Sequence, residues 1–182
     1  MDSRLSGSTL KDAFITGMME SGAKIYDCNM ASTPTMFMTT TWKDKSVTGA
    51  IMITASHLPF NRNGFKFFTK RGGLDKNDIS AILKIAENDS LSIQSDSSEC
   101  VRWNFIDEYA DFLVDYISKN AAINDKRTLE GLKIIVDAGN GAGGFFTTKV
   151  LDKLGADTTG SQFLNPDRNF PNHVPNPENY AK

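Results

Sequence analysis

The chain has 182 residues, of which 40% are hydrophobic and 23% are charged, and its formal net charge is −2. These values are typical of a soluble globular protein and give no sign of a nucleic-acid-binding or membrane-surface protein. No apolar run approaches the roughly 20 residues that a membrane-spanning helix needs. The length suits one large domain, or one domain with part of another.

The cysteines and the chain ends bear on the compartment. Cys28 and Cys100 match neither a zinc-site spacing nor a C-x-x-C pair, so we expect a reducing compartment, the cytoplasm by default. The segment Met1–Arg4 leads directly into a helix and lacks the apolar core of a signal peptide. Both ends of the chain look cut, so a lost transit peptide and an organellar location stay open.

Apolar periodicity and turn signals predict the elements of the first 120 residues. The expected helices cover 8–21, 33–40, 75–87 and 105–116, and the expected strands cover 24–28, 47–53 and 65–69. Asp75 is placed to cap the third helix. Gly72–Gly73 is expected to form a turn, and the polar stretch 95–99 a loop.

A polar stretch from 119 to 130 interrupts this pattern and predicts a domain boundary. After it we expect a strand at 132–136, a glycine loop at 139–144, a helix at 145–154 and a proline-rich extended tail. Alternating strands and helices predict an α/β fold with a mixed or largely parallel sheet and flanking helices. The predicted organisation is a first domain at 1–120, a linker at 121–130 and the start of a second domain at 131–182.

The segment TASHLPF places Ser56 and His57 on a loop between two expected strands, where Pro59 stiffens the backbone. A serine hydrolase would need a G-x-S-x-G turn, which this segment lacks. Neighbouring residues of an extended segment point to opposite sides, so His57 is not expected to act as a base for Ser56. Two interpretations stay open: a plain turn with a capping serine and a surface histidine, or a serine that carries a phosphoryl group.

A phosphorylated Ser56 would need cations nearby, because it brings roughly −1.5 to −2 charges and three acceptor oxygens. His57, Arg62 and Lys66 lie within ten residues of it, and Gly64 lets the backbone approach closely. A solvated surface loop could carry the same charges, so these residues alone do not separate the two interpretations.

Two other patterns have simpler explanations. Gly139–Gly144 fits G-x-G-x-x-G between an expected strand and helix, which is the context of a dinucleotide site. Asp157 follows no apolar strand and is a poor ribose ligand, so we favour a tight strand-to-helix crossover. Asp107, Asp111 and Asp115 recur every four residues and are expected on the solvated face of a helix rather than at a metal.

The order of several motifs along the chain is the strongest signal in the sequence. The motif segments are 2–7 (D-x-R-x-S-G), 33–36 (T-P-x-x), 53–59 (T-x-S-H-N-P), 63–66 (N-G-x-K), 136–143 and 165–178 (P-D-x-x-F-P-x-H-x-P-N-P-E). Together they resemble the α-D-phosphohexomutases, the family of phosphoglucomutase, phosphomannomutase and phosphoglucosamine mutase. The resemblance spans nearly the whole chain and implies that family's first domain plus the start of its similar second domain.

The resemblance implies an enzyme that interconverts hexose 1-phosphate and hexose 6-phosphate through a hexose bisphosphate. Ser56 matches the phosphoserine, Lys66 matches a candidate general base or charge stabiliser, and His57 would position or polarise the substrate. Arg62 and Asn63 are expected to bind substrate phosphate. Mg²⁺ would bind a phosphoserine oxygen together with carboxylates.

Two departures from the family pattern qualify this expectation. Leu58 stands where the family usually has Asn. The D-G-D-x-D-R loop that would supply the magnesium aspartates is absent, as are the segments of later domains and the first strands, which would leave an open sheet edge. We therefore expect an N-terminal fragment without activity of its own. The alternative is a noncatalytic remnant or a sugar-phosphate-binding module.

Overall fold

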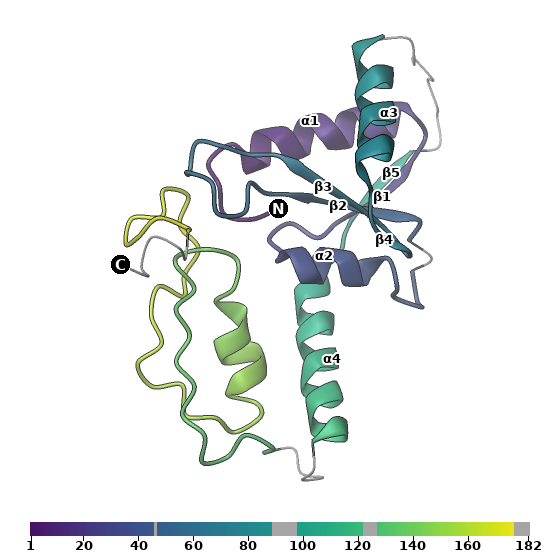
Figure 1. Ribbon diagram of the computed structural model, residues 1–182. Coiled ribbons are helices and arrows are strands. Elements are labelled where there is room, and N and C mark those ends of the chain that lie inside the picture. Colours follow the sequence, from purple (N-terminus) through teal and green to yellow (C-terminus); the bar gives the residue numbers. More distant parts are fainter. Residues whose placement is uncertain (46, 89–97, 122–126, 177–182) are drawn as a thin grey trace.

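The structure is a computed structural model and describes residues 1–45, 47–88, 98–121 and 127–176 (Figure 1). Its helices are α1 (Gly7–Glu20), α2 (Thr33–Thr39), α3 (Lys76–Glu87), α4 (Phe105–Asn120) and the π-helix η1 (Thr147–Leu151). Its strands are β1 (Lys24–Asp27), β2 (Gly49–Ile53), β3 (Phe65–Thr69), β4 (Gly72–Gly73) and β5 (Glu99–Arg102). The helices and strands predicted for the first 120 residues are confirmed, with small shifts at their ends. Within the described ranges, no helix has the length and apolar character needed to cross a membrane.

The strands form two separate sheets. β1 and β5 pair in parallel, with Lys24 opposite Glu99 and Asp27 opposite Arg102. β2, β3 and β4 form an antiparallel sheet in that order. In Figure 1, α1 lies above the strands and α2 below them. The predicted α/β class with flanking helices is therefore confirmed.

β5 replaces part of an expected loop. The predicted loop at 95–99 is wrong at Glu99, where β5 begins, and residues 95–97 lie outside the described part of the chain. Glu99, Cys100 and Arg102 are exposed, so the strand lacks the apolar pattern that would announce it. Pairing with β1 decides its conformation instead.

Short-range contacts explain where α3 begins. The Asp75 side chain accepts hydrogen bonds from the N–H groups of Asn77 and Asp78. The Asp78 carboxylate in turn accepts from the Asp75 N–H, which completes a capping box and confirms the predicted cap. Gly72–Gly73, just before, is β4 rather than the predicted turn, because its backbone pairs with the end of β3.

The hydrophobic core joins the first 120 residues of the chain to residues 127–176. We call these two parts the two halves of the chain. Phe105 is fully buried and packs edge-on against Trp42 and at a tilt against Trp103. Tyr109, one turn later on α4, packs against Phe145, with ring centroids 6.3 Å apart. Burial of one such large apolar side chain contributes about 1.5–3 kcal/mol. α4 therefore holds the two halves together, and Figure 1 shows it running beside both.

The acidic face of α4 also contacts the second half of the chain. Lys149 donates to the Asp107 carboxylate, and Lys153 pairs with Asp111 at 2.7 Å. Both aspartates stay substantially exposed, as the predicted solvated face requires, and each also pairs with a lysine because folding brings η1 and the residues after it alongside α4. Both pairs are partly exposed, so each contributes about 0–1 kcal/mol.

Residues 132–136 do not form the predicted strand. Parallel pairing there is limited to two isolated bridges, Lys133 with Asp157 and Asp137 with Gln162. Leu132 and Ile135 are more than half exposed, whereas strands of a parallel sheet are normally covered on both faces. The predicted helix at 145–154 is confirmed in part, since η1 covers its centre.

Candidate active site

Ser56 lies on the loop that joins β2 to β3, which we call the serine loop (residues 54–64). The Thr54 N–H donates to the Gly64 carbonyl at 2.9 Å and closes the base of the loop. Ser56 has a φ of 54°, in the left-handed region that is unfavourable for residues other than glycine. Such a backbone persists only where its surroundings hold it. Its side chain is exposed.

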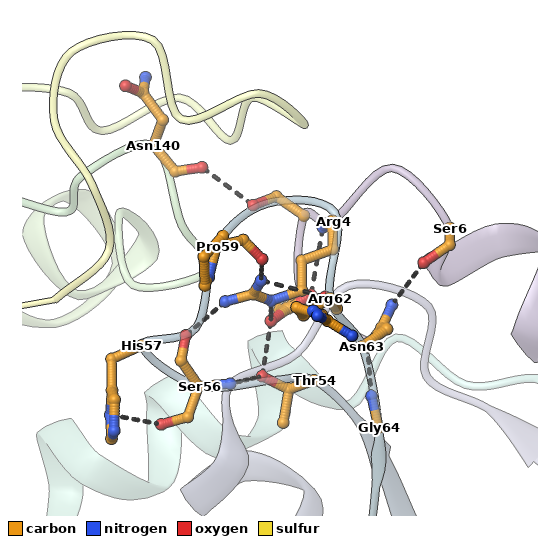
Figure 2. A network of polar contacts seen from close by, with 12 residues as sticks. Arg4, Ser6, Thr54, Ser56, His57, Pro59, Arg62, Asn63, Gly64 and Asn140 are labelled. Atoms are coloured by element: carbon orange, nitrogen blue, oxygen red, sulfur yellow. Dashed lines mark hydrogen bonds and ion pairs between the residues drawn. The ribbon is translucent and has the colours of Figure 1, made fainter.

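Arg4 holds the serine loop from inside. Its guanidinium donates to three loop carbonyls, those of Ser56 at 2.5 Å, Pro59 at 2.6 Å and Arg62 at 3.1 Å. The Arg4 side chain is fully buried, and its Nε forms an ion pair with Asp2 at 3.1 Å. Figure 2 shows the guanidinium at the centre of the loop, with the carbonyl groups directed toward it. A planar fork of donors suits this arrangement, and a lysine ammonium cannot reproduce it.

Thr54 and Asp2 complete the support of the serine loop. Thr54 Oγ1 accepts a hydrogen bond from the Ser56 N–H at 2.9 Å and donates to the Asp2 carboxylate at 2.6 Å. Because Asp2 also pairs with Arg4, one carboxylate connects both supports. Ser56 is thus held through its N–H and its carbonyl, while its hydroxyl stays available.

His57 lies closer to Ser56 than the sequence predicts. Ser56 Oγ and His57 Nδ1 are 3.3 Å apart, although an extended segment would direct the two side chains to opposite sides. That expectation is wrong because Ser56 is left-handed rather than extended. The contact is long and both side chains are exposed. In the described part of the chain no carboxylate contacts His57, so the pair lacks the third group of a hydrolase triad.

The other predicted site residues differ in what they contact. Asn63 is half-buried, and its amide donates to Ser6 Oγ at 3.1 Å while its Oδ1 accepts from the Gly64 N–H at 3.0 Å. Arg62 and Lys66 are exposed. Lys66 lies on β3, and among the described residues it makes no hydrogen bond with Ser56. The fold therefore uses Asn63 for support and leaves the two cations at the surface.

A cavity of about 490 Å³ opens beside Ser56, between the two halves of the chain. The residues that line it include Asp2, Ser56, Asp137, Gly139, Phe170 and His173. Two contacts join the halves there. Ser3 Oγ donates to the Asn140 carbonyl at 3.0 Å (Figure 2), and the Arg4 guanidinium lies 5.3 Å from the centroid of the Phe170 ring. The cavity thus has walls from both halves.

An acid–histidine pair lines the far side of this cavity. His173 Nε2 lies 3.0 Å from an Asp137 oxygen, and His173 Nδ1 lies 3.0 Å from the Val174 carbonyl oxygen. The hydrogen bond with Asp137 raises the pKa of His173 above its ordinary value. Burial raises the pKa of Asp137, but hydrogen bonds, chiefly with His173, outweigh it and leave this pKa below its ordinary value. Both shifts favour a charged pair in the cavity that Ser56 also lines.

The glycine loop at 139–144 packs against its own chain. A Cβ at Gly144 would lie 1.9 Å from the Leu164 carbonyl oxygen, and a Cβ at Gly139 would lie 2.7 Å from His173 Cε1. The Asn140 amide group between them is hydrogen-bonded to the tail that follows. These contacts favour the tight crossover over a dinucleotide site, because the glycines are needed for close packing within the chain.

A magnesium ion at the serine loop would need several oxygen ligands. In the described ranges no group of three His, Cys, Asp or Glu side chains could hold a metal ion. Asp2 lines the same cavity as Ser56, but its carboxylate is already bonded to Arg4 and Thr54. The described residues by themselves do not fit a magnesium site.

Three residues of this site have no role in the sequence prediction: Arg4, Asp137 and His173. All three lie in motif segments, but a motif does not show which distant groups its side chains reach. Arg4 bonds to carbonyls 52 to 58 positions away along the chain. The available signal was the order of the motifs, which indicates that separate segments share one site.

Comparison with known proteins identifies the family of this chain. Residues 1–92 match the model of phosphoglucomutase/phosphomannomutase, alpha/beta/alpha domain I, and residues 107–182 match that of alpha/beta/alpha domain II. The chain belongs to the phosphoglucomutase/phosphomannomutase family. The resemblance to phosphohexomutases is therefore confirmed. The linker at 121–130, part of which lies outside the described residues, stays a prediction.

Individual members of the phosphoglucomutase/phosphomannomutase family are similar along most of the chain. A phosphoglucomutase of Neisseria gonorrhoeae is 31% identical over 176 residues, which are 97% of this chain and 36% of that protein. A phosphoglucosamine mutase of Clostridium acetobutylicum is 34% identical over 161 residues, which are 87% of this chain and 35% of that protein. The crystal structure of a phosphoglucomutase/phosphomannomutase family protein from Burkholderia thailandensis has a TM-score of 0.81 at 28% identity, over 99% of this chain and 39% of that one. The chain thus spans little more than a third of the length of these relatives.

Proposed function

We propose that this chain supplies the phosphoserine loop of a phosphohexomutase, an enzyme that interconverts hexose 1-phosphate and hexose 6-phosphate. The observation that carries the proposal is the preformed serine loop, where Arg4 and Thr54 hold Ser56 in a left-handed conformation with its hydroxyl exposed. Membership of the phosphoglucomutase/phosphomannomutase family supports the same reaction.

The proposed cycle moves two phosphoryl groups through Ser56. The phosphorylated serine gives its phosphoryl group to a free hydroxyl of a hexose phosphate: the P–O bond to Ser56 breaks, a P–O bond to the sugar forms, and the sugar hydroxyl loses its proton. The resulting hexose bisphosphate turns over, and its other phosphoryl group returns to Ser56. Phosphoryl transfer depends mainly on positioning and charge neutralisation, and a rigid serine loop provides the positioning.

The polar residues around the serine loop are proposed to have distinct roles. Lys66 is proposed to take the sugar proton or to stabilise charge, and His57 to position or polarise the substrate. Arg62 is proposed to bind substrate phosphate. Asn63, which we also expected to bind phosphate, has its amide bonded to neighbouring groups. We therefore propose that Asn63 acts by shaping the loop.

Magnesium stays in the proposal as a hard cation that binds an oxygen of phosphorylated Ser56. Because the described residues contain no carboxylate cluster for it, its other ligands would come from outside them. We propose for this reason that the 182-residue chain has no mutase turnover by itself. Measurable conversion of a hexose 1-phosphate by the purified chain, with magnesium present, would contradict this part of the proposal.

A cytoplasmic location is part of the same proposal. Cys28 and Cys100 are both free, which suits a reducing compartment. Cell fractionation followed by immunodetection tests the location, and recovery of the protein mainly from an organelle would refute it.

The direct test is whether Ser56 becomes phosphorylated. The chain, alone and within any longer protein that contains it, is incubated with a hexose bisphosphate and analysed by intact mass and peptide mapping. We expect one phosphoryl group on Ser56. It should disappear in Ser56→Ala and persist in Ser80→Ala, which removes an exposed serine of α3. Binding of hexose phosphate without phosphorylation in any form would instead favour the noncatalytic sugar-phosphate-binding module.

A further inference from the structure

The edges and the faces of the buried Arg4 guanidinium need different partners. Along its edges, Nε donates to the Asp2 carboxylate, and the two terminal nitrogens donate to three carbonyls of the serine loop. The Arg4 side chain has no exposed surface. A guanidinium donates hydrogen bonds only within its plane, so its two faces need another kind of cover. An aromatic ring suits the face of a desolvated guanidinium, because the π-electrons attract the cation.

Phe170, in the second half of the chain, supplies such a ring. The guanidinium carbon of Arg4 lies over the Phe170 ring, 5.3 Å from its centroid. Phe170 is buried, and it lines the same cavity as Ser56. The cation that holds the serine loop is therefore covered by a side chain from the opposite half of the chain.

The chain on both sides of Phe170 is fixed to one residue, Asn140. Before Phe170, the Asp167 N–H donates to the Asn140 carbonyl at 2.8 Å. After Phe170, the Asn172 amide donates to Asn140 Oδ1 at 2.6 Å. Phe170 itself has a φ of 49°, a left-handed conformation that a bulky residue keeps only where its surroundings hold it. These contacts give the ring a defined place.

The Asn140 carbonyl also ties Phe170 to the segment that carries Arg4. It accepts a second hydrogen bond, at 3.0 Å, from Ser3 Oγ, and Ser3 directly precedes Arg4 in the chain. Ser3 and Arg4 are both buried. Two strained residues, Ser56 and Phe170, thus lie on opposite sides of one arginine. Strained residues gather where a fixed geometry serves a function.

We infer that Phe170 is a positioning residue for Ser56, which acts through the face of the Arg4 guanidinium. The ring keeps water from the cation and favours the guanidinium orientation that bonds the three loop carbonyls. Water at this place would compete for the same N–H donors. The second half of the chain therefore completes the support of the serine loop. The role of Phe170 in phosphoryl transfer rests on the proposed function, but its effect on the loop backbone can be measured separately.

The test compares three variants of the full chain. Phe170→Leu keeps an apolar side chain without the ring, and Phe170→Tyr keeps a ring. Phe163→Leu is the matched control, because Phe163 is also left-handed, at φ 52°, and its ring packs against the His173 ring. The readout is amide hydrogen exchange of the Ser56 N–H, which bonds to Thr54 Oγ1. We expect exchange about tenfold faster in Phe170→Leu and little changed in the other two variants.

Phosphorylation of Ser56 by a hexose bisphosphate is the second readout. We expect its rate to fall about tenfold in Phe170→Leu and to stay unchanged in Phe163→Leu, because phosphoryl transfer depends on the position of the serine. If no form of the chain becomes phosphorylated, the proposed function fails. Exchange at Ser56 then decides by itself whether Phe170 positions the loop.

Three outcomes would overturn the inference. They are unchanged exchange at Ser56 in Phe170→Leu, equally fast exchange in Phe163→Leu, and exchange in Phe170→Tyr as fast as in Phe170→Leu. A measurement on the unaltered chain covers the case in which Phe170→Leu does not fold. The ring current of Phe170 should shift the NMR signals of the Arg4 guanidinium protons upfield, and Phe170→Tyr should keep this shift. An Arg4 guanidinium without such a shift would also overturn the inference.

Discussion

The serine loop and the glycine loop both hold a residue in the left-handed conformation, and they do so by different means. Ser56, at φ 54°, depends on the Arg4 guanidinium and the Thr54 hydroxyl, which are side chains of other residues. Asn140, at φ 59°, depends on its own side chain, which donates to the Asn165 carbonyl and accepts from an N–H of another asparagine in the tail. The serine loop therefore leaves its central side chain available for chemistry, whereas the glycine loop uses its central side chain for structure.

This difference indicates which loop can be reactive. A side chain can meet a ligand without rearrangement when its backbone is fixed by other groups. The Ser56 hydroxyl is exposed, and within the described ranges its one hydrogen-bond partner is His57 Nδ1, at 3.3 Å. Asn140 is buried, and its carbonyl accepts from Ser3 Oγ, so the glycine loop is bonded to the segment whose Arg4 supports the serine loop. Substitutions at four positions, with their controls, can break or sharpen this comparison.

Loss of the buried guanidinium should have the largest effect. Arg4→Met leaves the Asp2 carboxylate and three loop carbonyls without their partner, so we expect the free energy of unfolding to fall by about 3–5 kcal/mol. Urea unfolding followed by circular dichroism measures it. Arg4→Lys should recover only part of the loss, because an ammonium cannot reproduce the planar fork. A lysine variant as stable as the original chain would refute the role given to the fork.

The glycine loop should be weakened less by the loss of its central side chain. Asn140→Ala removes the amide hydrogen bonds and leaves an alanine at φ 59°. We therefore expect the free energy of unfolding to fall by about 2–3 kcal/mol. Glycine adopts this backbone conformation without strain. Asn140→Gly should therefore lower the free energy of unfolding by about 1–2 kcal/mol, because only the hydrogen bonds are lost. If glycine and alanine are equally destabilising in urea unfolding, the left-handed backbone is not what Asn140 secures.

The His173–Asp137 pair beside the glycine loop should make a smaller contribution to the stability of the fold, and this contribution should depend on pH. His173, with a raised pKa, stabilises the fold fully below its ordinary value of 6.5, and this contribution is lost as the pH rises through the folded-state pKa. Asp137, with a lowered pKa, stabilises the fold above its ordinary value of 3.8, and this contribution is lost as the pH falls through the lowered pKa. As the pH rises from below 6.5 through the raised folded-state pKa of His173, the melting temperature should therefore decline.

His173→Gln should flatten this decline in thermal unfolding measured across that pH range. His57→Gln is the matched control on the serine loop, because His57 is exposed and contacts no carboxylate among the described residues. It should leave the decline unchanged. An unaltered decline in His173→Gln would assign the pH dependence to another group.

The smallest effect on stability is expected at Leu58, which is 50% exposed on the serine loop. Leu58→Asn should change the free energy of unfolding by less than about 0.5 kcal/mol, as for most surface substitutions. It adds hydrogen-bond donors beside Ser56, so we expect faster phosphorylation of Ser56 by a hexose bisphosphate. Leu83→Asn, on α3, should alter neither quantity. A stability change above about 1 kcal/mol at Leu58 would mean that the loop depends on this side chain.

The sequence by itself determined the features that depend on short-range contacts or on the order of motifs. The Asp75 cap is one, because a capping box needs only four consecutive residues. The α/β class, the family and the placing of Ser56 on a loop between strands are others, since periodicity and motif order are visible along the chain. The serine loop was therefore found without a structure, although the left-handed conformation of Ser56 was not.

Only the tertiary structure decided the features that depend on distant partners. β5 exists because β1 pairs with it along four residues, whereas the described backbone around residues 132–136 pairs through two isolated bridges. Arg4 became the support of the serine loop, and His173 came to line the cavity beside Ser56, only when far segments met. The physical reason is the same in each case: a hydrogen bond or a buried surface between distant residues leaves no periodicity in the sequence around either one.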